Sequence, residues 1–133
     1  MNNIVKAYAN ALFELCVEKQ CLEHVYQDII VMNEVIDDAY LMLYIQPNIT
    51  KITKKQMMQE VFQNVNPLLL NFVQILIDKN KIKYLKAMFN AFDALYNEYH
   101  GVIEIVIHTA KQLSEQQIER IKTSFEKKYE KKN

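Results

Sequence analysis

The chain has 133 residues, enough for one folded domain with a real core and a small appendage. Half of its residues are hydrophobic, which excludes a disordered chain, and one glycine with two prolines is too few for a turn-rich all-β fold. The 16 basic side chains are balanced by 16 acidic ones, so the basic surplus typical of nucleic-acid binders is missing. The composition therefore favours an all-α protein that binds no nucleic acid.

The N-terminal segment has helical spacing almost from its first residue, so we expect no signal peptide. Because the sequence has no extracellular signature, we expect its two cysteines to be reduced thiols. From residue 4 to about residue 19 the apolar positions make two stripes. One stripe is Val5, Ala9, Leu12 and Cys16, and the other is Ile4, Tyr8, Ala11 and Leu15. Because a surface helix needs only one buried stripe, the core alone does not explain the second.

Three more helices are predicted before the middle of the chain. The second covers about residues 22–37, and a short third covers residues 39–45. The apolar face of the second helix is predicted to be Leu22, Val25, Ile29, Met32 and Ile36. Pro47 ends that third helix, because proline pushes the residue before it out of the helical region. The capping-box pattern from Thr53 to Gln56 predicts a fourth helix with Thr53 as its N-cap.

Residues 67–79 are the most apolar stretch and are predicted to form the central helix of the bundle. Asn66 suits the N-cap and Pro67 the first helical position. The run is apolar on nearly every side, so we expect other helices to surround it. It is too short for a transmembrane segment, which needs roughly 17–25 apolar residues.

A sixth helix is predicted over residues 82–100, with Gly101 as its C-cap. Its predicted apolar face is Leu85, Met88, Phe89, Phe92, Leu95, Tyr96 and Tyr99. Residues 102–108 then alternate, with Ile103, Ile105 and Ile107 on one side, which predicts a β-strand. A capping box beginning at Ser114 predicts another helix after it. Because a lone strand has unpaired edges, we interpret residues 1–100 as a six-helix bundle and residues 101–133 as the start of an incomplete second domain.

Few residues suggest a catalytic, metal-binding or phosphate-binding site. Cys16, Cys21 and His24 could be part of a metal site, but no fourth ligand follows at a matching spacing, so we interpret the cysteines as buried or half-buried thiols. His100 and His108 are interpreted as polar surface groups. No glycine-rich phosphate loop is present. We therefore predict no catalytic residue, no metal, no cofactor and no enzymatic activity.

Three stretches, spread along essentially the whole chain, carry a resemblance to a known family in their order and spacing. They are Tyr8-Ala9-Asn10-Ala11-Leu12-Phe13, Pro47 with the lysine-rich start of the fourth helix, and Thr109-Ala110-Lys111-Gln112-Leu113-Ser114-Glu115-Gln116-Gln117. Together they resemble the delta subunit of F-type ATP synthases, called oligomycin-sensitivity-conferring protein in mitochondria. The chain departs from the family pattern at Lys81, where arginine is usual, and at Gln112, where proline is frequent. Family members also continue beyond the position of Asn133, so we expect the second domain to be incomplete here.

The resemblance implies a non-catalytic stator subunit that supports proton-driven ATP synthesis. Its N-terminal bundle would hold N-terminal helices of the alpha subunits on the catalytic head, and its second domain would grip the b subunits of the peripheral stalk. The protein would then lie at the cytoplasmic face of the bacterial inner membrane, as a peripheral protein. The alternative is a helical bundle that carries a small apolar ligand or cofactor. The doubled apolar face of the first helix favours the stator, and no convincing pair of axial haem ligands is present.

The second stripe of the first helix is the candidate partner site. If the first helix lies beside the central one, both can border a groove for an amphipathic partner helix, with Ala11 at its floor. Asn71 and the Tyr8 hydroxyl could satisfy polar groups at its edge. The resemblance implies the same place, because the family's alpha-binding groove lies between its first and fifth helices. The alternative is that these residues are interior packing. The predicted groove residues are Ile4, Tyr8, Ala11, Leu15, Leu68, Asn71 and Ile75.

Overall fold

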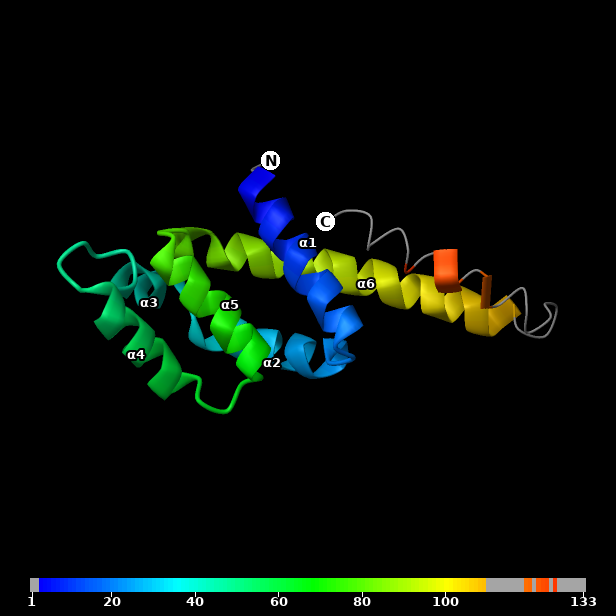
Figure 1. Ribbon diagram of the computed structural model, residues 1–133, viewed down its shortest axis with the longest axis horizontal. Helices are drawn as coiled ribbons and strands as arrows, with labels where there is room; N and C mark the ends of the chain where they lie inside the picture. The colour runs from blue at the N-terminus through cyan, green and yellow to red at the C-terminus, as the bar shows by residue number, and fades with distance from the viewer. Residues whose placement is uncertain (1–2, 110–118, 121, 125, 127–133) are drawn as a thin grey trace.

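The computed structural model describes residues 3–109, 119–120, 122–124 and 126 (Figure 1). The elements in these residues are α1 (Asn3–Glu18), α2 (Leu22–Val35), α3 (Asp38–Leu43), α4 (Lys51–Val61), α5 (Pro67–Asp78), the 3-10 turn η1 (Ile82–Tyr84) and α6 (Leu85–Thr109). No strand occurs among the described residues, which confirms the predicted all-α class for this part of the chain.

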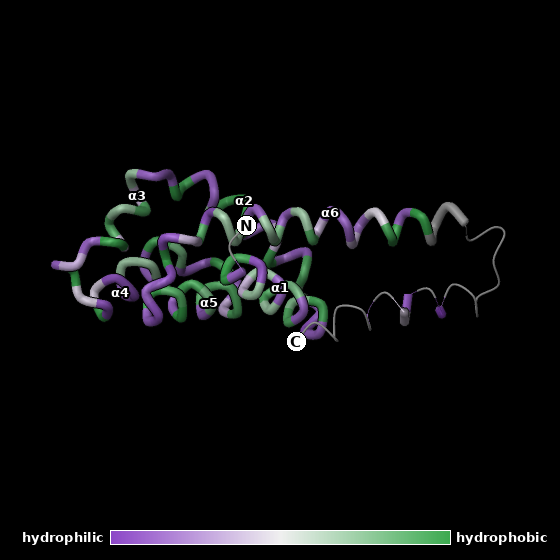
Figure 2. Tube along the Cα trace, turned by 90° about the horizontal axis from the view of Figure 1, so that it is seen from above, coloured by the Kyte–Doolittle hydropathy of each residue, from purple (hydrophilic) through white to green (hydrophobic). Residues whose placement is uncertain are grey.

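Helix α6 is the element against which the bundle packs. It has 25 residues and contacts α1, α2 and η1, and its last turns extend beyond the other helices (Figures 1 and 2). Its first part carries the apolar face predicted from the sequence, with Leu85, Met88, Phe89 and Phe92 buried. Phe13 of α1 meets Phe92 edge to face, with ring centroids 5.6 Å apart.

The predicted core stripes of the first two helices are confirmed. The buried residues of these stripes are Val5, Ala9, Leu12 and Cys16 in α1, and Leu22, Val25, Ile29 and Met32 in α2, with Ile36 just after it. Asp37 then caps α3, because its carboxylate accepts a hydrogen bond from the Tyr40 amide at 2.7 Å.

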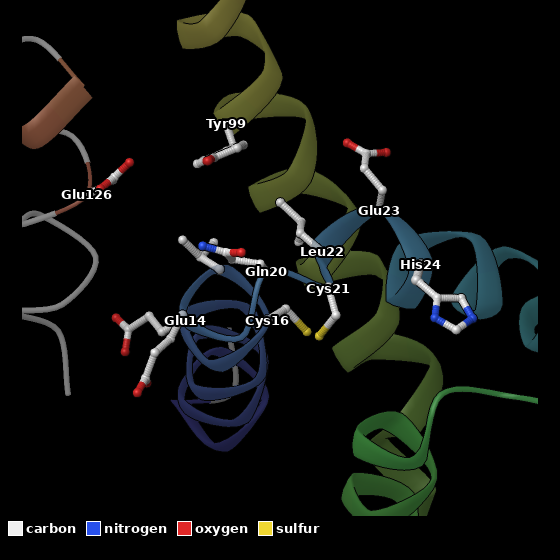
Figure 3. A pocket seen from close by; sticks show the side chains of 11 residues that line it. Glu14, Cys16, Gln20, Cys21, Leu22, Glu23, His24, Tyr99 and Glu126 are labelled. Atoms are coloured by element: carbon white, nitrogen blue, oxygen red, sulfur yellow. The ribbon is translucent and has the colours of Figure 1, made fainter. Parts of the chain in front are cut away.

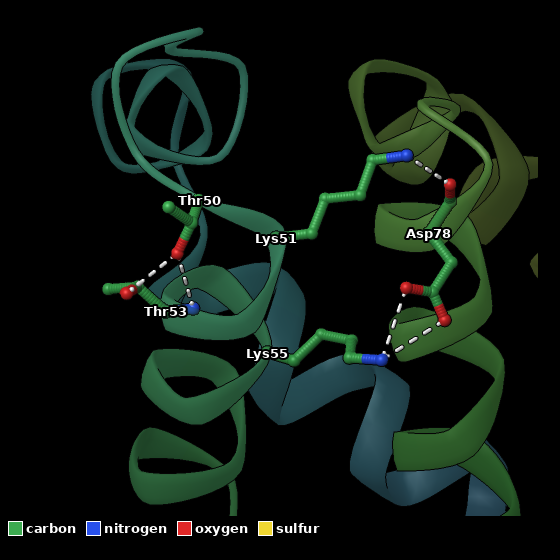
Figure 4. Close-up of polar contacts among 5 residues, drawn as sticks. All are labelled: Thr50, Lys51, Thr53, Lys55 and Asp78. Atoms are coloured by element: carbon green, nitrogen blue, oxygen red, sulfur yellow. Dashed lines mark hydrogen bonds and ion pairs between the residues drawn. The ribbon is translucent and has the colours of Figure 1, made fainter.

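Helix α4 begins one turn earlier than the capping-box pattern predicted. Thr50 is its N-cap and accepts a hydrogen bond from the Thr53 amide, so the prediction of Thr53 as N-cap is wrong. The earlier start places Lys51 and Lys55 on one side of α4, facing the end of α5 (Figure 4). Lys51 donates to the Asp78 carbonyl oxygen at 2.7 Å, and Lys55 lies 3.1 Å from the Asp78 carboxylate. Lys51 thus provides a hydrogen-bond donor for a backbone carbonyl group at the C-terminal end of α5.

Helix α5 starts as predicted but is not surrounded by other helices. Asn66 is its N-cap, accepting from the Leu68 amide at 2.9 Å, and Pro67 takes the first helical position. Asn71 and Ile75 are exposed, however, so the prediction that this helix is the enclosed centre of the bundle is wrong. Its core residues are confined to one side, and α6 takes the central place.

The predicted strand over residues 102–108 is wrong, because α6 continues through this segment to Thr109. Gly101 is likewise no C-cap: it lies inside the helix and has no positive φ. A helix pairs its backbone N–H and C=O groups internally, whereas a strand needs a partner strand. The helix predicted to begin at Ser114 starts outside the described residues. The domain division between residues 100 and 101 stays a prediction.

Candidate partner-helix surface

The two apolar stripes of α1 differ in burial. The first stripe lies in the core, as described above. In the second stripe, Ile4 and Tyr8 are half-buried, whereas Ala11 and Leu15 are exposed, Leu15 with 39% of its surface accessible. This outward stripe gives α1 more apolar surface than the core of the bundle uses.

Helix α5 presents its three predicted groove residues away from its core face. The core face consists of Leu69, Val73, Leu76 and Ile77. Leu68 is half-buried, Asn71 is exposed, and Ile75 has 37% of its surface accessible. The N-cap at Asn66 fixes where α5 begins, and with it the direction of each of these side chains. An amide and an aliphatic side chain therefore lie together on the outer surface of α5.

The two helices lie side by side in both views of the chain (Figures 1 and 2). The contact between them is an edge-to-face pair of Tyr8 and Phe72, with ring centroids 6.3 Å apart and planes at 65°. Phe72 lies outside the predicted set, but it falls four residues after Leu68 and three before Ile75, on the same side of α5. This pair brings the outward stripe of α1 next to the outer surface of α5.

The chemistry of this surface suits binding rather than catalysis. Apart from the Tyr8 hydroxyl, the seven predicted residues carry no titratable group. Exposed Leu15 and Ile75 offer apolar area for the anchors of a partner helix, and Asn71 offers an amide donor and acceptor. That all seven residues border a single groove stays a prediction.

A cavity of about 1070 Å³ lies at the other end of α1, where α1 turns into α2 (Figure 3). Its lining includes Glu14, Cys16, Cys21, His24 and Glu126. Within the described residues, no cluster of three His, Cys, Asp or Glu side chains is arranged to hold a metal ion. The His24 ring instead bonds through Nδ1 to the Asn66 side chain at 3.2 Å, with Nε2 3.5 Å from Asp28.

A polar network between α2 and α6 was missed by the sequence analysis. Tyr26 donates a hydrogen bond to Asp93, and its ring stacks on Tyr96 with centroids 3.5 Å apart. Tyr96 donates to Glu23 at 2.5 Å, and His100 lies 2.7 Å from the same carboxylate. The Tyr96 bond and then His100 hold the pKa of Glu23 below its ordinary value, against a partial desolvation that raises it. His100, interpreted as a simple surface group, therefore helps to join the two helices.

The family model described as ATP synthase delta (OSCP) subunit matches residues 4–133. The chain belongs to this family. The ATP synthase subunit delta of Anoxybacillus flavithermus is 32% identical over 127 residues, which cover 94% of this chain and 71% of the relative. The subunit of the same name from Bacillus mycoides is 34% identical over 127 residues, with the same coverage. That of Caldanaerobacter subterraneus is 28% identical over 130 residues, or 97% of this chain and 73% of the relative.

The resemblance to the delta subunit family inferred from the sequence is thus confirmed. The family is that of a non-catalytic subunit of the ATP synthase complex, consistent with a site built from aliphatic, aromatic and amide side chains. Within the part of the chain that the structure describes, no helix is both long and apolar enough to cross a bilayer.

Proposed function

We propose that this delta-family chain is a non-catalytic stator subunit of an F-type ATP synthase, which links the catalytic head to the peripheral stalk. The family match over residues 4–133 carries this proposal. In this role the protein keeps the head from turning with the rotor and supports proton-driven ATP synthesis. It lies at the cytoplasmic face of the bacterial inner membrane as a peripheral protein.

We propose further that the surface between α1 and α5 binds the N-terminal helix of an alpha subunit. The outward stripe of α1 and the outer surface of α5 meet at the Tyr8–Phe72 pair, and both expose aliphatic side chains there. An amphipathic helix can bury its apolar anchors on Leu15 and Ile75 while Asn71 bonds to its polar edge. The b subunits of the peripheral stalk then bind the C-terminal domain.

The test is calorimetric titration of the full chain with a peptide of the alpha-subunit N-terminus. Ile75→Arg is expected to weaken binding more than tenfold, since truncating or charging an interface anchor typically costs about 2 kcal/mol or more. The matched control is Ile52→Arg, which charges an isoleucine that is 69% exposed on α4, a helix that lies away from α1 in Figure 1. Far-UV circular dichroism and a thermal melt show whether each variant is folded. Unchanged affinity in folded Ile75→Arg would place the alpha-binding site elsewhere.

A second variant tests the α1 side of the same surface. Tyr8→Ala combined with Leu15→Ala removes the aromatic contact and the exposed leucine, and we expect it to weaken peptide binding while helicity is retained. A collapsed melt would show that these side chains stabilise the bundle rather than bind a partner. The stator role also requires both partners to bind at once, so a b-subunit segment should bind the chain already saturated with the alpha peptide. Mutual exclusion of the two peptides would contradict it.

A further inference from the structure

The end of α1 is closed by a backbone motif that places two cysteines in contact. Gln20 adopts the left-handed conformation, with φ of 57°. Its amide donates to the Val17 carbonyl at 3.2 Å, and the Cys21 amide donates to the Cys16 carbonyl at 3.0 Å. This pair of hydrogen bonds defines a Schellman motif, in which the residue after the left-handed position contacts a residue in the last helical turn. Here those two contacting residues are Cys16 and Cys21.

The separation of the two backbones meets the requirement for a disulfide bond. A disulfide needs Cα atoms within roughly 7 Å of each other. With standard bond lengths, the 3.0 Å bond from the Cys21 amide to the Cys16 carbonyl limits that Cα–Cα distance to about 7 Å. The side chains are also oriented for it, because Figure 3 shows the two sulfur atoms facing each other.

The two thiols differ in their access to solvent. Both line the cavity at the α1–α2 turn, but Cys16 is fully buried, whereas Cys21 is half-buried. Cys21 is also the N-cap of α2, yet its side chain makes no capping hydrogen bond. The Cys21 sulfur instead faces the Cys16 sulfur (Figure 3). These are the only cysteines in the chain, so no other internal thiol competes for either of them.

We propose that Cys16 and Cys21 form a reversible intramolecular disulfide when the protein meets a low-molecular-weight disulfide such as oxidised glutathione. The Cys21 thiolate attacks one glutathione sulfur, which forms a mixed disulfide and releases the first glutathione thiolate. Cys16 then loses its proton and attacks the Cys21 sulfur, which releases the second glutathione thiolate. Two protein thiols are oxidised, and one glutathione disulfide is reduced to two glutathione molecules.

The order of the two steps follows from burial. Cys21 reacts first because its side chain is half-buried, whereas Cys16, although it lines the same cavity, is fully buried and resolves the mixed disulfide from within the core. Burial raises the pKa of the Cys16 thiol well above its ordinary value. The fraction of Cys16 thiolate, and with it the rate of the second step, should therefore rise about tenfold for each pH unit in the neutral range.

Tryptic peptide mapping tests the proposal directly, because Lys19 lies between the two cysteines. The full chain is incubated with oxidised glutathione, blocked with iodoacetamide and digested without reductant. We expect a mass loss of two hydrogen atoms from the intact chain, and peptides 7–19 and 20–51 joined through their cysteines. Dithiothreitol should separate these two peptides. A stable glutathione adduct on Cys21, or a covalent dimer on a non-reducing gel, as the main product would overturn the proposal.

Two matched variants then separate the roles of the thiols. Cys16→Ala should keep one glutathione on Cys21, because the resolving thiol is gone. Cys21→Ala should stay unmodified under the same conditions, because Cys16 is fully buried. Equal modification of both variants, in samples whose circular dichroism matches that of the parent chain, would contradict the assigned order. The peptide map of the parent chain decides the existence of the disulfide even if either variant fails to fold.

Discussion

The two parts of α6 belong to one continuous helix but have different surroundings. In the first part, Leu85, Phe89 and Phe92 are buried, and α1 and α2 pack against this face. In the second part, Ile105 is 64% exposed, and a Cβ added to Gly101 would meet nothing within 4 Å. Among the described residues, tertiary packing is therefore dense around the first part and sparse around Gly101 and Ile105.

This difference shows why local pattern misled the prediction for residues 102–108. Glycine and the β-branched residues all have a lower helix propensity than alanine, and for glycine the difference is about 1 kcal/mol. Their alternation is typical of a strand, but a strand gains its hydrogen bonds only from a neighbour. A helix that is already nucleated by the packed first part adds one internal bond per residue, which favours its continuation through Gly101.

The largest effect is expected from truncating the packed part of α6. Phe92→Ala removes a fully buried ring that meets Phe13, and should lower the free energy of unfolding by about 3–5 kcal/mol. Ile105→Ala in the second part should change it by less than about 0.5 kcal/mol, because most of that side chain is already exposed. Urea denaturation followed by circular dichroism measures both. Similar losses for the two variants would show that both parts of α6 are equally packed.

A smaller effect is expected at the network that joins the first part of α6 to α2. Tyr26→Phe keeps the ring stacked on Tyr96 but removes the hydrogen bond to Asp93, and should cost about 1 kcal/mol at neutral pH. That bond, then burial, raises the pKa of Tyr26 to about 12. The stabilisation from Tyr26 is therefore fully present below its ordinary pKa of 10 and is lost as the pH rises through 12.

The measurement for Tyr26 is a series of thermal melts between pH 8 and pH 12, together with tyrosinate absorbance. The parent chain should lose stability more steeply than Tyr26→Phe above pH 10. Tyr84→Phe is the matched control, since Tyr84 lies in η1 with Lys83 over its ring, outside the network. An identical loss of thermal stability above pH 10 in all three proteins would mean that the hydrogen bond to Asp93 does not shift the titration of Tyr26.

The next effect tests the continuity of α6 itself. Gly101→Ala should stabilise the chain by about 0.5–1 kcal/mol, because Gly101 is helical, has open space at its Cβ position and restricts the unfolded chain less than alanine does. The free energy of unfolding, measured by equilibrium denaturation, and the magnitude of the helical ellipticity should both rise slightly. A left-handed C-cap at Gly101 would give the opposite sign, so a loss of stability would restore the helix end predicted from the sequence.

Much of the fold could be predicted because its determinants are local. The core stripes of α1 and α2, the apolar face of α6 and the N-cap at Asn66 all follow from spacing along a single helix. The start of α4 could not be predicted in this way. Thr50 and Thr53 are both suitable N-cap residues, and the start at Thr50 brings Lys51 and Lys55 to Asp78, more than twenty residues away.

The candidate surface shows the same limit. The outward stripe of α1 was visible as apolar residues beyond the needs of the core, and Ile75 and Asn71 are indeed exposed on α5. Phe72, whose ring meets Tyr8, was not identified, because which α5 side chain meets α1 depends on how the two helices pack. The pairing of Glu23 with His100 joins residues 77 positions apart, and no sequence period reports such a contact.

The smallest effect concerns Glu23, at the exposed edge of the α2–α6 network. Its pKa is held below the ordinary value of about 4.5, first by the Tyr96 hydrogen bond and then by His100. The resulting stabilisation is present above that value and is lost as the pH falls through the lower pKa of the folded protein. Because the Glu23 side chain is 62% exposed, solvent screening limits the effect to a few tenths of a kcal/mol. Carboxyl-carbon NMR titration is sensitive enough to measure it. Tyr96→Phe should raise the pKa of Glu23 toward its ordinary value by more than His100→Gln does. The reverse order would make the imidazole, rather than the phenol, the main contact that Glu23 makes with the packed part of α6.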